Sequence, residues 1–352
     1  MTDEPSTGDH PSAATLSRLI ELSRGVHHGI ALGDAADHLT STAPVWPTGV
    51  ATQLTLATTE GLVRAMERAG QGLGVDWGHE NLEALRRWAT AQQVPGVAGN
   101  RTGTPGLLSR SPAFGARRGN APATVRSLRS GPPAGPGQGS LGAHALVRTL
   151  PFGVLLTLHG PSLTWPVEEL VGTTHTHPLA TPTATLDALL VAQASDRSVP
   201  LAEGFSALLE NHAPEGGDLV TKRVGAAVTT AAVEPCDPAR VADLAPDRSA
   251  ASTLAAAVYV VLSHPDPHEL MLAMALASFS PEKHGTSAVV GGLLGARHGS
   301  TPMLERGAAR LELAWACDAL ATDLAMTAML TPLGKEPDGA PWLPSWGARY
   351  TG

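Results

Sequence analysis

The sequence predicts an all-α protein, in which one compact helical domain carries a long irregular insertion rich in Gly, Pro and Arg. Three observations carry this prediction. Apolar residues make up 43% of the 352 residues but aromatic residues only 4%, so Ala, Leu and Val must build most of the core, and Ala favours closely packed helices. Apolar positions recur at helical spacing along much of the chain. No series of segments shows the alternating pattern of β-strands.

Three helices are predicted at the start of the chain. Residues 13–32 and 52–69 have apolar side chains at helical spacing, and the second run ends at Gly70, a residue type that often terminates helices. Residues 81–91 form the third, with Asn81 in the N-cap position because its side chain can accept from free backbone N–H groups.

The helical pattern is lost over residues 95–139, where Gly, Pro, Ser and Arg dominate. Since residues 13–70 are too short to form a core alone, we interpret 95–139 as an insertion rather than a linker. Further helices are predicted at 143–157, 181–194, 200–212, 251–263, 267–279, 286–297 and 303–330. The predicted organisation is a disordered tail (1–12), one domain (13–333) and a C-terminal tail (334–352).

Charge is unevenly distributed. The chain carries a net charge of -8, yet residues 84–167 contain no Asp or Glu. This stretch carries the following arginines: 86, 87, 101, 110, 117, 118, 126, 129 and 148. Such asymmetry fits either a solvated loop region or a phosphate-bearing ligand or acidic partner. A nucleic-acid partner is disfavoured because aromatic residues are not interleaved with these arginines.

Composition excludes several other classes. The longest apolar run is far shorter than the roughly 18 residues that a membrane span needs, and the N-terminus is acidic and polar rather than signal-like. Cys236 and Cys317 are the only cysteines, which excludes a disulfide framework and a cysteine-based zinc site. A cytoplasmic protein is expected.

Histidine is the most frequent reactive residue type, with 14 copies. Most are expected to be surface or capping residues, but His175 and His177 lie two apart before Pro178, at the entrance to a predicted helix, where both could face a ligand. A GxGxxG match at 137–142 does not follow a strand and is not interpreted as a dinucleotide site. No group of closely spaced Asp and Glu residues indicates a magnesium site.

Five segments, in order, resemble the ADP-ribosylglycohydrolase family (the ADP-ribosyl-acceptor hydrolases and dinitrogenase-reductase-activating glycohydrolases). They are GVHHGIALGDAADHL at 25–39, TGVATQLTLATTEGLVRAM at 48–66, GSLGAHALVR at 139–148, THTHP at 174–178 and SPEKHGTSAVVGGLLGARHG at 280–299. The resemblance implies a single all-α domain around a central helical bundle.

The resemblance also implies two magnesium ions, held by an adjacent Asp pair and by two further Asp. This sequence has Val50 and Ala51 at the first motif and Glu282 and His284 at the second, with Lys283 between them. Val and Ala cannot coordinate a metal, and magnesium prefers several hard oxygen ligands. No metal cofactor is therefore expected, unless nearby acids or histidines rebuild a magnesium site.

The family's ligand-binding motifs are better matched in this sequence than its metal-binding motifs. The resemblance implies contacts to an ADP-ribose-type nucleotide by Asp34, by the loop residues Gly139, Ser140, Leu141 and Gly142, and by His175, with His177 beside it. A glycine-rich loop that runs into a helix can bind a diphosphate through backbone N–H groups.

Three functional hypotheses remain open. The protein binds ADP-ribose, NAD or a related nucleotide without magnesium-dependent hydrolysis, as a sensor or pseudoenzyme. Alternatively, the protein hydrolyses an N- or O-glycosidic bond of an ADP-ribosylated substrate, with acid–base groups drawn from Glu282, His284, His144, His175 and His177. In the third hypothesis the cavity is inactive and the segment 95–139 contacts a protein partner.

Overall fold

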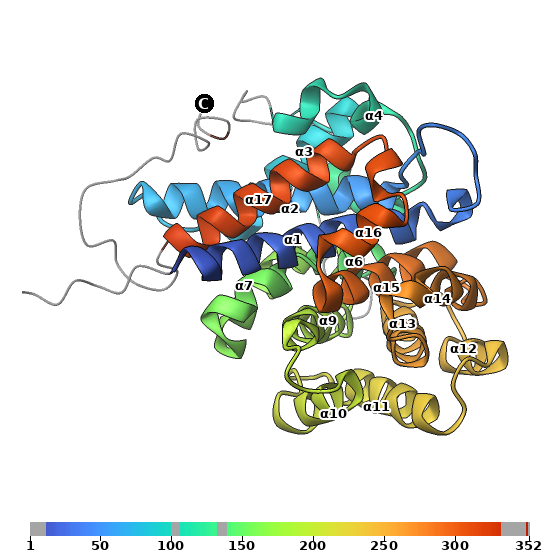
Figure 1. The fold of residues 1–352 in the computed structure, drawn as a ribbon. Helices are drawn as coiled ribbons and strands as arrows, with labels where there is room; N and C mark the ends of the chain where they lie inside the picture. The colour runs from blue at the N-terminus through green and yellow to red at the C-terminus, as the bar shows by residue number, and fades with distance from the viewer. Residues whose placement is uncertain (1–11, 100–105, 132–138, 332–349, 351–352) are drawn as a thin grey trace, which may run out of the picture.

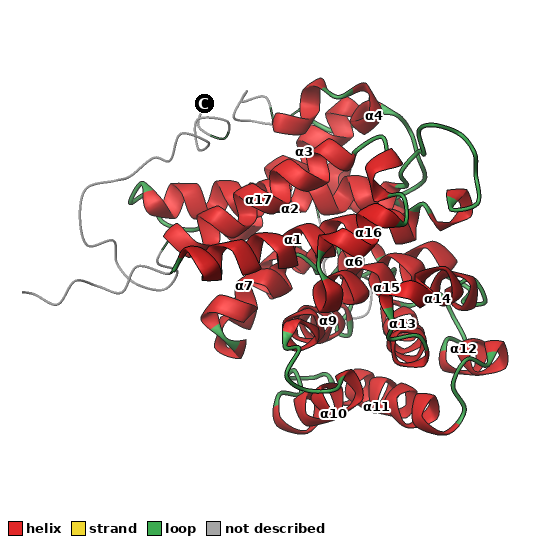
Figure 2. Cartoon of the chain, in the orientation of Figure 1, coloured by secondary structure: helices red, strands yellow, loops and turns green. Residues whose placement is uncertain are grey.

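The structure is a computed structural model that describes residues 12–99, 106–131, 139–331 and Tyr350. Within these ranges the chain forms helices and no strand; the only β-type contacts are isolated bridges between Trp46 and Leu311 and between Gly142 and Ser249 (Figure 2). The prediction of an all-α fold is confirmed. None of the described helices has the length and apolar character needed to cross a bilayer.

The longer helices, in chain order, are α1 (Ala13–Asp34), α2 (Val50–Gly70), α3 (Trp77–Ala91), α9 (Ala180–Ser195), α10 (Leu201–Asn211), α11 (Asp218–Val233), α13 (Ala250–Ser263), α15 (Lys283–His298) and α17 (Ala314–Leu330). The shorter ones are α4 (Pro112–Gly115), α5 (Pro122–Ser130), α6 (His144–Thr149), α7 (Phe152–His159), α8 (Trp165–Gly172), α12 (Pro238–Leu244), α14 (Leu270–Ala277) and α16 (Ser300–Glu305). Five short 3₁₀ segments complete the set: Ala36–His38, Leu107–Arg110, Pro161–Thr164, Pro267–Glu269 and Ala308–Arg310.

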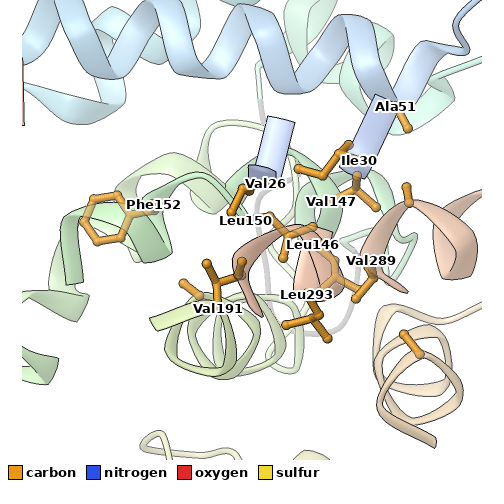
Figure 3. Close-up of a cluster of buried hydrophobic side chains, with 14 of the residues drawn as sticks. Val26, Ile30, Ala51, Leu146, Val147, Leu150, Phe152, Val191, Val289 and Leu293 are labelled. Atoms are coloured by element: carbon orange, nitrogen blue, oxygen red, sulfur yellow. The ribbon is translucent and has the colours of Figure 1, made fainter. Parts of the chain in front are cut away.

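Helix α1 lies at the centre of the bundle, with α2 and α17 on one side and α15 on the other (Figure 1). The α10–α11 pair packs on α9 and α13 and forms the layer farthest from α2 and α3. Apolar side chains from α1, α6, α9 and α15 meet in the interior, among them Ile30, Leu146, Val191 and Leu293 (Figure 3). This core fixes where the ends of those helices lie.

The closest approach between α1 and α15 is made by backbone atoms. Gly29 lies against Gly291, Gly25 against Gly295, and Gly33 against Ser287. A Cβ atom at any of these three α1 glycines would overlap a backbone carbonyl of α15. The pairing runs in opposite directions along the two helices, so the end of α1 meets the start of α15.

The structure divides two of the predicted helices. The predicted helix 143–157 is interrupted at Leu150 and Pro151 between α6 and α7, and 303–330 is split by a turn before α17. Helix α3 begins four residues earlier than expected, with the Asp76 side chain accepting from the His79 N–H. The predicted N-cap residue Asn81 is instead fully buried inside α3.

Helices α8, α11 and α12 were not predicted. The buried stripe of α11 consists of the small or β-branched residues Val220, Val224, Ala227 and Ala231, which repeat every three or four positions without a leucine. Such a stripe is helical in period, but it is weak in hydrophobicity and β-branched side chains lower helix propensity. Packing on α13 therefore stabilises α11 more than its local sequence does.

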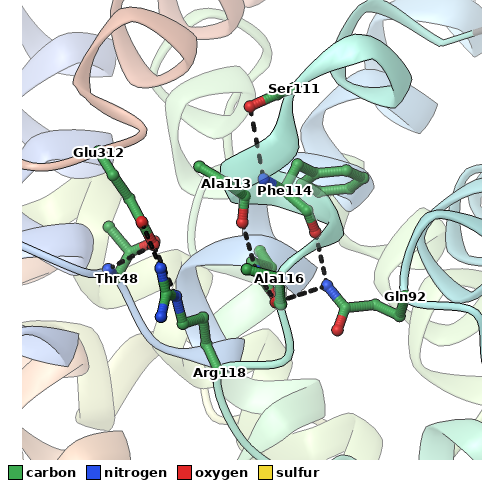
Figure 4. A network of polar contacts seen from close by, with 9 residues as sticks. Thr48, Gln92, Ser111, Ala113, Phe114, Ala116, Arg118 and Glu312 are labelled. Carbon is green, nitrogen blue, oxygen red and sulfur yellow. Dashed lines mark hydrogen bonds and ion pairs between the residues drawn. The ribbon is translucent and has the colours of Figure 1, made fainter.

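The segment predicted to be an irregular insertion is largely loop, with three short helical pieces (Leu107–Arg110, α4 and α5) in its described part. Gln92 donates to the carbonyl oxygens of Phe114 and Ala116 at 2.5 and 2.9 Å, and Gln53 donates to those of Ala113 and Ala116 at 3.1 and 2.9 Å. Figure 4 shows the bonds from Gln92 to Phe114 and Ala116. Two glutamines of the bundle thus fix the loop, which also buries Leu108, Phe114 and Leu128 in the core.

The two predicted tails lie mostly outside the described residues. Ser12 is the N-cap of α1, because its hydroxyl accepts from the Thr15 N–H at 3.2 Å. Tyr350, inside the predicted C-terminal tail, is buried; its hydroxyl donates to Asp323 at 2.6 Å, and its carbonyl accepts from Arg64 at 2.6 Å.

Gly29→Ala tests the contact between α1 and α15. The added methyl group meets the Gly291 carbonyl, so the helices must separate, and we expect a loss of about 3 kcal/mol or more in the free energy of unfolding. Gly172→Ala is the matched control, because a Cβ there meets no atom within 4 Å; it should change stability by about 1 kcal/mol or less. Urea unfolding measures both. Equal stabilities for the two variants would contradict this interpretation.

Asp187→Asn tests a buried carboxyl group. Asp187 on α9 is fully buried, neither carboxyl oxygen has a partner among the described residues, and burial raises its pKa well above 3.8. The protonated Asp187 favours the folded state. The free energy of unfolding therefore falls as pH rises from the pKa of Asp187 in the unfolded chain to its raised pKa in the folded chain. The near-isosteric amide should therefore gain stability over the native chain as pH rises from 5 to 8, by at most about 1.4 kcal/mol per pH unit. Unfolding free energies with a pH-independent difference would refute this.

Candidate functional site

A cavity of about 660 Å³ lies where the ends of several helices meet. Its lining includes most of the site residues predicted from the sequence: Asp34, Val50, Ala51, Ser140, Gly142, His144, His175, Glu282 and His284. These residues come from α1, α2, α6, α15 and the loops before α6 and α9. The segments that resemble the family motifs therefore converge on one site.

Three predicted ligand residues do not line this cavity. Gly139 packs against the backbone of Thr176 and His177, which leaves no room for a Cβ atom. The Leu141 carbonyl accepts from the Ala250 N–H at 2.6 Å. His177 Nδ1 accepts from the Leu179 N–H at 3.1 Å, so this ring stabilises the turn that leads into α9. These three residues shape the loops around the cavity.

Asp34 stabilises the start of α2. Its Oδ2 accepts from the backbone N–H and the hydroxyl of Thr52, at 2.8 and 2.7 Å. Helix α2 begins after Gly49, which has no side chain to act as a cap, and a Cβ at Gly49 would overlap the Asp34 carboxylate. Burial raises the pKa of Asp34, while the bonds from Thr52 oppose that rise. A carboxylate from α1 thus performs the capping that α2 cannot perform itself.

The residues at the start of α15 form an ion pair. Lys283 Nζ donates to both oxygens of Asp37 at 3.0 and 2.9 Å, and His284 Nε2 lies 3.8 Å from the same carboxylate. The hydrogen bond from Lys283 lowers the pKa of Asp37. Glu282, the N-cap residue of α15, lines the cavity beside His284.

Helix N-termini point at the cavity from several directions. Gly49 and Val50 at the start of α2, Pro122 at the start of α5, and Glu282 at the start of α15 all line it. The N-terminal end of a helix carries about half a positive elementary charge and exposes free N–H groups. Such a field favours an anionic ligand, and it is opposed at α2 by the Asp34 carboxylate and at α15 by Glu282.

Arg118 and Arg248 line the cavity, but the sequence analysis did not identify them as site residues. Arg118 makes two hydrogen bonds to Glu312, at 3.0 and 2.6 Å, and Glu312 also accepts from the Thr48 N–H (Figure 4). The excess of arginine in residues 84–167 was the sequence signal that could have pointed to Arg118.

Arg248 is exposed in the loop before α13. The hydrogen bond from the Ala250 N–H to the Leu141 carbonyl holds that loop beside residues 139–142. No sequence motif near Arg248 predicts that this residue lines the cavity.

His144 and His175 are both neutral near pH 7. Burial, together with the charge of Arg148, lowers the pKa of His144 to about 4 and that of His175 to about 3. His175 is 1% exposed, and its Nε2 is buried with no partner among the described residues. A buried N–H or ring nitrogen without a partner is costly, and His175 lines the cavity.

The positions of the family's first metal motif carry no donor atoms. The Val50 side chain packs against Gly119, where a Cβ would lie 3.0 Å from Val50 Cγ1. Within the described ranges, no three His, Cys, Asp or Glu side chains are grouped closely enough to hold a metal ion together. Asp37, the acid nearest the second motif, is paired with Lys283.

The sequence model of the ADP-ribosylglycohydrolase family matches residues 16–332. The chain belongs to the ADP-ribosylglycohydrolase family. Its fold is similar to a solved structure described as "ADP-ribosylglycohydrolase-related protein complex", with a TM-score of 0.58 and 20% identity over 89% of this chain and 99% of that one. No curated protein is significantly similar to it in sequence. Family membership explains why five separated segments meet at one cavity.

Asp34→Ala tests the role of Asp34 in this member of the ADP-ribosylglycohydrolase family. Removing the carboxylate leaves the Thr52 N–H and hydroxyl without their acceptor, so we expect a loss of about 1–3 kcal/mol in stability. Asp37→Ala is the control: its ion pair with Lys283 is exposed, and such pairs contribute about 1 kcal/mol or less. Chemical unfolding of both variants gives the comparison, and a larger loss for Asp37→Ala would be inconsistent with the capping role.

Proposed function

We propose that this protein binds ADP-ribose, NAD or a related nucleotide in the cavity and does not perform magnesium-dependent hydrolysis. The observation that carries the proposal is the joint lining of one cavity by the glycine-rich loop, by His175 and by the N-terminal ends of α2, α5 and α15. Ligand sites of small molecules typically measure about 300–1,000 Å³, and the cavity lies within that range. The positive field of the helix ends suits a diphosphate.

The residues present do not fit the family's magnesium ions. The side chains of Val50 and Ala51 offer only carbon atoms, and the Lys283 ammonium neutralises Asp37. Magnesium needs near-octahedral oxygen coordination, and Asp34 already uses one carboxylate oxygen for Thr52. We therefore assign the compensation of ligand charge to the chain's own cations and helix ends, and propose that no metal cofactor takes part.

The second candidate is a hydrolase that works without metal. Glu282, His284 and His144 line the same cavity, and carboxylates and histidines are suitable acid–base groups. His144 is the weakest of the three, because a pKa of about 4 leaves it without a proton to donate near pH 7. Loss of turnover on Glu282→Gln would support this candidate.

A role of residues 95–139 in binding a protein partner, and a cytoplasmic location, stay predictions. Residues 100–105 and 132–138 lie outside the described residues. The described part of the segment packs on the bundle through Gln53 and Gln92, and supplies Arg118, Gly119 and Asn120 to the cavity wall. This packing supports a role in the cavity.

A thermal-shift and calorimetric titration with ADP-ribose, in magnesium and again in EDTA, tests the proposed function. We expect stabilisation in both buffers, of about 2.7 kcal/mol when ADP-ribose is at a hundred times its Kd. Ser140→Trp should weaken binding strongly because the indole fills the cavity beside the loop. Ala226→Trp on the exposed face of α11 is the control.

Two results would contradict the proposal. Stabilisation in magnesium alone would show a metal-dependent site. The absence of binding in either buffer would refute the assignment of ADP-ribose.

A further inference from the structure

Arg248 is a cation of the cavity lining that has no partner among the described residues. Its side chain is exposed in the loop before α13, and no hydrogen bond or ion pair joins it to another residue that the structure describes. Arg248 also lies outside the five segments that resemble the family motifs. Its presence at the cavity is therefore a feature of this chain that the shared motifs do not account for.

Arg118, the other described arginine of the lining, has its charge compensated. Its guanidinium donates to both carboxylate oxygens of Glu312, at 3.0 and 2.6 Å. The same carboxylate accepts from the Thr48 N–H at 3.1 Å, so this ion pair attaches the loop of Arg118 to the bundle. Of these two guanidinium groups, that of Arg248 is the one whose donors are free for a ligand.

The carboxylates of the lining leave Arg248 free. Asp34 accepts hydrogen bonds from the start of α2, and Asp37 pairs with Lys283. Glu282 also lines the cavity, but no ion pair joins it to Arg248. A guanidinium that is neither paired nor buried keeps its full charge and all of its N–H donors available.

The backbone that carries Arg248 is attached to the glycine-rich loop. The Ala250 N–H donates to the Leu141 carbonyl at 2.6 Å. An isolated antiparallel bridge joins Ser249, the residue next to Arg248, to Gly142. Since Gly142 lines the same cavity as Arg248, the guanidinium is tethered beside the loop whose backbone N–H groups suit a phosphate.

Asp247 and Arg223 fix this loop from its other side. Asp247 Oδ1 accepts from the Ser249 N–H at 2.9 Å and from the Ser252 hydroxyl at 2.6 Å. Arg223 on α11 donates to the Ser252 hydroxyl oxygen at 2.9 Å. The carboxylate next to Arg248 in the chain is thus bonded to the loop itself. A fixed backbone reduces the ordering that ligand binding requires.

We propose that Arg248 is a specificity-determining residue, which binds an anionic phosphate group of the ligand beside the glycine-rich loop and so selects phosphate-bearing nucleotides over nucleosides. A guanidinium suits this role because its planar donors can bind two phosphate oxygens at once. The inference rests on the proposed function for the nucleotide part of the ligand. It deepens that function, because it names the chemical group of the ligand that this chain selects and the side chain that selects it.

Calorimetric titration of the full chain in EDTA tests the inference, with ADP-ribose, inorganic pyrophosphate and adenosine as the probes. Arg248→Met removes the charge and keeps an unbranched side chain. We expect it to weaken binding of ADP-ribose and pyrophosphate at least about tenfold, the usual effect of losing a hydrogen bond to a charged group. Arg248→Lys should give intermediate affinities, because it keeps the charge without the paired donors.

Adenosine isolates the contribution of the phosphates. We expect the native chain to bind adenosine at least about tenfold more weakly than ADP-ribose, and Arg248→Met to leave the adenosine affinity within about twofold of the native value.

Arg197→Met is the matched control, because it changes the net charge by the same amount. Arg197 is also exposed and without a partner among the described residues. It lies near Gly299, where a Cβ atom would be 3.4 Å from its Nη2, and Gly299 follows the end of α15 that is remote from the cavity. This variant should bind all three probes as the native chain does.

The possible failures of the two proposals are distinguishable. Equal affinities of the native chain and Arg248→Met for ADP-ribose and pyrophosphate would overturn the inference and leave the proposed function standing. Pyrophosphate binding that depends on Arg248, without ADP-ribose binding, would refute the proposed function alone. A native chain that binds neither phosphate probe, or an equal loss of adenosine and ADP-ribose affinity in Arg248→Met, would overturn the inference.

Discussion

The backbone contact between α1 and α15 sets the geometry of the whole molecule. Because glycines replace side chains at this crossing, the two helices approach until each touches the other's carbonyl groups, and their antiparallel register is fixed. Asp34 at the end of α1 therefore meets the first turn of α15, and its carboxylate reaches Thr52 at the start of α2. The cavity lies at this junction, so its shape follows from how closely two helices can pack.

Positively charged protein groups lie at the cavity, together with the carboxylates of Asp34, Asp37 and Glu282. The N-terminal ends of α2, α5 and α15 and the side chains of Arg118 and Arg248 surround it, while Arg148 lies fully buried behind His175. Burial, and after it the charge of Arg148, keeps His144 and His175 neutral. With pKa values of about 4 and 3, both histidines are poorly suited to proton transfer near pH 7.

The arginine-rich segment acts within the fold. Arg117 and Arg129 donate to backbone carbonyls of Gln92 and Pro95, and Arg118 pairs with Glu312. Gln53 and Gln92 complete the attachment by donating to the Ala116 carbonyl, just after α4. An excess of arginine in one stretch thus reflects both the need to satisfy irregular backbone and a contribution to the cavity wall.

The sequence by itself determined the helical class, most of the long helices and the five motifs, because apolar periodicity and glycine spacing are local signals. It could not reveal α11, whose small residues gain their stability from α13. It could not separate His175, which lines the cavity, from His177, which bonds the turn. Nor could it show that Asp34 caps another helix, that Lys283 pairs with Asp37, or that Arg248 joins the site. These facts depend on contacts between residues far apart in the chain, which only the packing of the helices brings within bonding distance.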